Sequence, residues 1–73
     1  MPFIAIPRDA RDKLVEGAKR LRNARKAGQS WNIEFEEAWR TGFLDAMRSR
    51  YPSETVGLLA TAYDDELDRN DSA

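Results

Sequence analysis

The densest group of residues that could carry chemistry is a run of cationic side chains in the first half of the chain. Five of the eight positions from 19 to 26 are basic. They are Lys19, Arg20, Arg22, Arg25 and Lys26. Clustered positive charge attracts the phosphates of nucleic acids and the acidic surfaces of proteins. A solvated helix surface has the same composition, so the sequence leaves all three interpretations open.

A second charged group, rich in carboxylates, lies near the C-terminus. Its acidic residues are Asp64, Asp65, Glu66, Asp68 and Asp71. The segment lacks the glycine at the sharp turn and the closing bidentate glutamate of an EF-hand calcium loop. A tail that solubilises the protein or docks onto a basic surface is the better interpretation. Because such a tail competes with phosphates for the basic cluster, direct nucleic-acid binding is disfavoured.

The sequence offers little for catalysis or metal binding. It contains no cysteine and no histidine, which removes disulfides, the usual zinc ligands and the Ser-His-Asp and Cys-His relays. Paired carboxylates such as Glu36 and Glu37 come without a nucleophile, a metal ligand or a glycine-rich phosphate loop. We therefore expect a protein that is not an enzyme, with no catalytic residue and no metal or other cofactor.

Nothing in the sequence resembles a secretory signal or a membrane span. The longest apolar run near the N-terminus covers only residues 3–6, and a proline stands on each side of it. We expect a soluble cytoplasmic monomer that makes no contact with a membrane.

The same short run is predicted to form an extended N-terminal arm over residues 1–8, because its flanking prolines favour extended backbone. The arm carries three large apolar side chains: Phe3, Ile4 and Ile6. They would either fold back over the core, or belong to a docking arm that pairs with a sheet edge or fills a groove on another protein. These three residues and the basic cluster are the candidate partner-binding residues.

Three helical segments are predicted to position these groups. Apolar residues recur at helical spacing over about 10–27, 31–50 and 54–66. We therefore predict an all-α fold. It consists of one small three-helix domain over residues 1–67, which includes the extended arm, followed by a disordered acidic tail over 68–73.

Large apolar residues at a constant spacing of four dominate the second segment. They are Trp31, Phe35, Trp39, Phe43 and Met47. This spacing stacks side chains along one ridge of a helix, and the ridge turns by about 40° at each step, or roughly 160° in all. We expect the ridge to form the core, covered on both sides by the first and third helices, with little surface left for a ligand.

Local signals predict where the helices begin, end and cross. The predicted N-caps are Asp9, Ser30 or Asn32, and Ser53. Gly28 is the predicted C-terminal stop of the first helix. Gly17 and Gly42, which are costly inside helices, indicate close helix crossings. Glu36 and Arg40 have the spacing of an ion pair within one helix.

Charge is distributed unevenly along the chain although the net charge is only −1. Residues 8–28 carry eight basic and three acidic side chains (+5), residues 29–50 three and four (−1), and residues 51–73 one and six (−5). A chain polarised in this way can approach an anionic partner with one end and a cationic partner with the other. It can also fold its own ends together.

The order of arm, helix, turn and helix in about the first 50 residues resembles the ribbon-helix-helix transcription factors. Residues 3–7 (FIAIP) before residues 10–15 (ARDKLV) carry this resemblance. It implies a dimeric DNA-binding repressor that lays a strand in the major groove. The strand of that family exposes polar side chains to the bases, whereas this segment is apolar, so the repressor is the alternative hypothesis.

In length and overall character the whole chain resembles the small host-takeover proteins of lytic bacteriophages that bind bacterial RNA polymerase. A short helical chain without catalytic groups, with polarised charge and an apolar arm, is compatible with what this resemblance implies. The resemblance implies a regulator in the host cytoplasm that docks on RNA polymerase, inhibits promoter initiation by interfering with the sigma factor, and lets transcription pass terminators. This is the leading prediction. An antitoxin-like adaptor for another protein is a further alternative.

Overall fold

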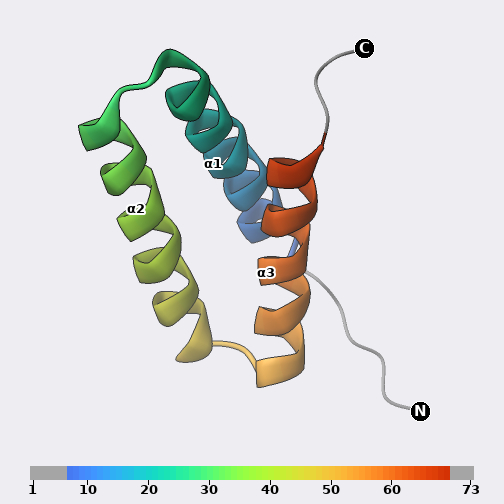
Figure 1. The fold of residues 1–73 in the computed structure, drawn as a ribbon. Coiled ribbons are helices and arrows are strands. Elements are labelled where there is room, and N and C mark those ends of the chain that lie inside the picture. The colour runs from blue at the N-terminus through green and yellow to red at the C-terminus, as the bar shows by residue number, and fades with distance from the viewer. Residues whose placement is uncertain (1–6, 70–73) are drawn as a thin grey trace.

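The computed structural model describes residues 7–69, and these form three helices without a strand (Figure 1). Helix α1 spans Arg8–Ala27, α2 spans Ser30–Arg48 and α3 spans Ser53–Asp68. The predicted all-α, three-helix fold is confirmed, and each boundary lies within two residues of the expected one.

Most of the predicted arm and tail lies outside the described residues, including the candidate partner-binding residues Phe3, Ile4 and Ile6. Where the two segments meet the helices, the predicted limits are wrong. Arg8 is already helical, and α3 continues through Asp68. Arg69 then leaves the helix with extended backbone angles, φ −59° and ψ 130°.

The helices begin without the predicted side-chain caps. The N-cap residues are Pro7, Gln29 and Pro52, and none donates or accepts a capping hydrogen bond through its side chain. The predictions of Asp9, Ser30 or Asn32, and Ser53 as N-caps are therefore wrong. Proline fixes φ near its helical value, which allows α1 after Pro7 and α3 after Pro52 to start one or two residues earlier than expected. Asp9 still lies in the first turn of α1, where its negative charge interacts favourably with the positive end of the helix dipole.

Gly28 ends α1 as predicted. Its φ of 71° lies in the left-handed region, which costs glycine little. The amide of Gln29 reaches back to the carbonyl of Ala24 at 3.3 Å, which satisfies part of the last helical turn. The chain can therefore reverse within two residues, and α2 returns alongside α1.

The core lies mainly between α1 and α3. Leu14, Leu21, Leu59 and Tyr63 are the largest fully buried side chains, and all four belong to these two helices. Among the described residues, Leu44 is the sole buried apolar residue from α2. In Figure 1, α1 passes behind and between the other two helices, so α1 is the central helix.

The prediction that the aromatic ridge of α2 forms the core is wrong for its first half. Trp31 is 71% exposed and Phe35 is 59% exposed, whereas Trp39, Phe43 and Met47 pack against the core. The constant spacing of four explains the difference. Because the row rotates about 40° per step, it starts on the outer face of α2 and turns toward the core only at Trp39.

Trp39 reaches the core by lying on Gly17 of α1. A Cβ atom added at Gly17 would overlap the indole and lie 2.9 Å from its Cε3 atom. Trp39 also stacks on Phe43, with ring centroids 5.1 Å apart. The predicted close crossing at Gly17 is confirmed. The one at Gly42 is wrong, because nothing lies within 4 Å of a Cβ built there.

Candidate protein-binding surface

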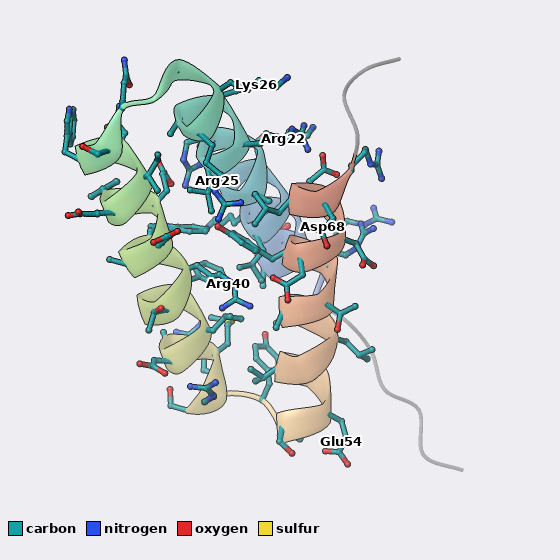
Figure 2. All side chains as sticks on the ribbon, in the orientation of Figure 1. Arg22, Arg25, Lys26, Arg40, Glu54 and Asp68 are labelled. Carbon is teal, nitrogen blue, oxygen red and sulfur yellow. The ribbon has the colours of Figure 1, made fainter. Side chains whose placement is uncertain are left out.

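The five residues of the basic cluster do not form one patch. They follow one another around α1, so their side chains leave the helix in different directions. Figure 2 shows Arg25 between α1 and α2, whereas Lys26 points away from the bundle. Arg20 and Arg25 pair with residues of α2, and Arg22 pairs with α3. The other two members, Lys19 and Lys26, have exposed side chains.

Arg20 links α1 to the middle of α2. Its Nε donates to both carboxylate oxygens of Glu36 at 3.1 Å. Its guanidinium also lies 4.9 Å from the centroid of a Trp39 ring, which adds a cation–π contact. Since Glu36 is buried, this pair holds α2 against α1 directly after the exposed Phe35. Arg20 therefore has a structural role in positioning the outer face of α2.

Arg22 joins the basic segment to the acidic one. Its Nη1 donates to the main-chain carbonyl of Glu66 and lies 3.3 Å from the carboxylate of the same residue. Both side chains are largely buried, at 15% and 8% exposed. The carbonyl is in the last turn of α3, where the helix dipole and nearby carboxylates favour a cation. The polarised chain thus pairs its own ends, as one of the sequence interpretations proposed.

The remaining ion pairs lie nearer the solvent. Arg25 and Glu37 approach to 3.5 Å with both side chains about half exposed, which is worth little stability. Arg40 pairs with Asp64 of α3 at 3.2 Å and covers the ring of Tyr63, 5.0 Å from its centroid. The predicted pair of Glu36 with Arg40 is therefore wrong, since each residue has found a partner on another helix.

Tyr63 is a titratable residue that belongs to the apolar core. Its ring is buried, and within residues 7–69 its hydroxyl has no hydrogen-bond partner. Burial raises the pKa of Tyr63 above 10.0, and the positive charge of Arg40 partly opposes that shift. Tyr63 belongs to the buried apolar cluster, so its main role is in packing.

The outer face of α2 carries an apolar row that the sequence interpretation missed. Its members are Trp31, Phe35, Ala38, Gly42 and Ala46, and all five are exposed. We call them the outer row. Their spacing of four, three, four and four residues follows a single helix face. The helical spacing of the outer row was visible in the sequence. However, Trp31 and Phe35 also belong to the aromatic ridge, and the other three residues are too small to indicate an apolar helix face.

The outer row has an uneven shape. Trp31 and Phe35 form a bulky half near the turn that joins α1 to α2, and the small residues form the other half. Acidic side chains border the row: Glu34 and Asp45 are exposed next to it. Exposed aromatic residues grouped on one face are typical anchors of protein interfaces. The outer row is therefore the candidate protein-binding surface of the described chain.

Other site types find no support in the part of the chain that the structure covers. No group of three or more acidic, histidine or cysteine side chains is placed to hold a metal ion there. No described helix is both long and apolar enough to cross a membrane.

Comparison with protein-family models, with curated proteins and with solved structures finds no significant match to this chain.

Proposed function

We propose that this protein is a non-enzymatic regulator that binds bacterial RNA polymerase and inhibits promoter initiation. The observation that carries a binding role is the exposure of Trp31 and Phe35 on one face of α2. Aromatic side chains supply most of the binding energy in many protein interfaces. The choice of polymerase as partner rests on the overall resemblance to phage regulators of transcription, which also motivates read-through of terminators as a second effect.

The surroundings of the two aromatic residues support a role in docking. Arg20 and Glu36 fix the adjacent turn of α2 to α1, and Trp39 is seated on Gly17. The backbone under Trp31 and Phe35 is therefore held in place before any partner arrives. A preorganised anchor loses less conformational entropy on binding than a mobile one.

The basic residues have two different roles in this proposal. Arg20, Arg22 and Arg25 hold the helices together, whereas Lys19 and Lys26 face the solvent and steer an acidic partner surface toward the protein. Lys19 makes no ion pair with another described residue. The arm residues Phe3, Ile4 and Ile6 are kept in the proposal as a second apolar anchor.

Capture of purified bacterial RNA polymerase on the immobilised protein at moderate salt tests this function. The wild type should retain polymerase and reduce sigma-dependent transcription from a promoter. The double variant Trp31→Ala/Phe35→Ala should lose both effects by tenfold or more, because it removes two interface anchors. Leu58→Ala is the matched control, since Leu58 is an exposed apolar residue on α3.

The outcome also separates the alternatives. Failure of the wild type to retain polymerase would reject the proposal. Retention of a different protein from a lysate, lost in the same double variant, would instead support the adaptor alternative. No observation in residues 7–69 favours the ribbon-helix-helix repressor, whose strand would fall on residues 3–7.

A further inference from the structure

We propose that the outer row of α2 also binds a second copy of this chain, in an antiparallel helix pair. The proposal replaces the expectation of a monomer. It does not depend on the polymerase hypothesis, because it concerns the protein alone.

The sizes of the residues in the outer row make it complementary to itself. When two copies of α2 run in opposite directions about a two-fold axis that passes between residues 38 and 39, Trp31 of one copy faces Ala46 of the other. In the same register Phe35 faces Gly42, and the two Ala38 residues lie next to each other beside the axis. Each bulky half then covers a small half. Alanine and glycine allow the close helix approach that such packing needs, and a two-fold axis makes every contact occur twice.

The space at Gly42 favours this occupant. Nothing lies within 4 Å of a Cβ built on Gly42, and the residue is exposed in the middle of a helix. Glycine there destabilises α2 by about 1 kcal/mol relative to alanine, and no close packing at this position in the monomer compensates for that loss. In the dimer, the bare backbone receives the ring of Phe35 from the second copy.

Charges beside the outer row agree with the same register. In an antiparallel pair, equivalent flanks of the two helices face each other. Arg48 lies on the same flank as Glu34 and is held by Asp45, with Nη1 2.6 Å from a carboxylate oxygen. Side chains in a helix lean toward its N-terminus, so Arg48 of one copy leans toward Glu34 of the other. The positive charge of Arg48 also offsets the repulsion between Asp45 of its own copy and Glu34 of the other copy.

The surface area that the outer row can bury indicates how strong the dimer is. The exposed parts of Trp31 and Phe35 amount to on the order of 250 Å² per copy, given that an aromatic side chain buries about 150–250 Å². With the surface that receives them, both copies together bury about 1,000 Å². This is the lower end for a specific interface, so we expect a weak dimer with Kd in the micromolar range.

Sedimentation equilibrium over a series of protein concentrations tests the pairing. The average mass of the wild type should rise from that of the monomer toward twice that value, and Trp31→Ala/Phe35→Ala should remain monomeric. A wild type that stays monomeric up to several hundred micromolar would overturn the proposal.

Charges placed beside the axis test the register. Ala38→Glu and Ala38→Lys should each abolish the dimer, because like charges meet across the axis, and an equimolar mixture of the two should restore it as a heterodimer. Thr61→Glu, also at an exposed helical position but on α3, should dimerise like the wild type. Dimerisation of Ala38→Glu at wild-type strength, or a mixture that stays monomeric, would contradict the antiparallel pairing. Circular dichroism of each variant confirms that the helices remain.

Discussion

Arg22 and Glu66 lie 44 positions apart and join the end of α3 to the C-terminal half of α1 through one guanidinium. Arg22 binds both the carboxylate and the main-chain carbonyl of Glu66, in largely buried surroundings. The C-terminal turn of α3 is acidic, and the last turn itself contains no basic residue; Arg69 follows just beyond the helix. Arg22 therefore brings a cation from α1 to this turn.

Replacement of Arg22 should destabilise the protein strongly. Arg22→Ala leaves the Glu66 carboxylate largely buried without this partner, and we expect the free energy of unfolding to fall by about 2–4 kcal/mol. Arg25→Ala removes a half-exposed pair and should cost less than about 1 kcal/mol. Urea denaturation followed by circular dichroism measures both. Equal losses in the two variants would show that the Arg22 pair is no stronger than a surface pair.

The variant Gly17→Ala should show that close packing against Trp39 outweighs the higher helix propensity of alanine. Alanine favours a helix by about 1 kcal/mol over glycine, yet at position 17 its Cβ would overlap the ring of Trp39. We expect Gly17→Ala to destabilise the protein by about 1–3 kcal/mol. Gly57→Ala is the control, because its Cβ meets nothing within 4 Å, and it should stabilise the protein by up to about 1 kcal/mol. Thermal unfolding of both variants decides the point, and a stabilised Gly17→Ala would exclude the close crossing.

Tyr63 should be replaceable by phenylalanine at no cost. The variant Tyr63→Phe removes a buried hydroxyl that has no partner within residues 7–69, so its stability at neutral pH should equal or exceed that of the wild type by up to about 1 kcal/mol.

The same residue should give the protein a dependence on alkaline pH. Because the pKa of Tyr63 is raised above 10.0 in the folded state, the unfolded chain loses this proton first as the pH increases. Wild-type stability should therefore fall more steeply above pH 10 than that of Tyr63→Phe. Parallel pH profiles of the two proteins would argue against a perturbed Tyr63.

The helices and two glycines could be predicted from the sequence because their signals are local. Helical spacing of apolar residues and the stop at Gly28 depend on near neighbours in the chain. Gly17 was expected to mark a crossing, although its contact with Trp39 needed the structure.

The orientation of α2 could not be predicted in the same way. A row spaced by four rotates around the helix, and nothing in its spacing says which part faces the core. Trp31 and Phe35 were therefore taken as core residues, and the outer row was overlooked. The partners of Arg20 and Arg22 were equally hidden, since each arginine pairs across 16 or 44 positions with one of several available carboxylates.

The exposed position of the outer row is the central claim, and oxidative footprinting tests it most directly. Hydroxyl radicals modify accessible aromatic side chains, and mass spectrometry reads the extent of modification residue by residue. The experiment uses dilute protein, below the concentration at which it dimerises, with and without purified bacterial RNA polymerase. Leu58, exposed on α3, serves as the internal reference.

We expect Trp31 and Phe35 to be modified readily in the free protein, more than Trp39, and to be protected several-fold when polymerase is added, while Leu58 keeps its reactivity. Protection confined to α3 or α1, or unchanged reactivity of Trp31 and Phe35 in a sample that has bound polymerase, would contradict the assignment of the outer row as the binding surface.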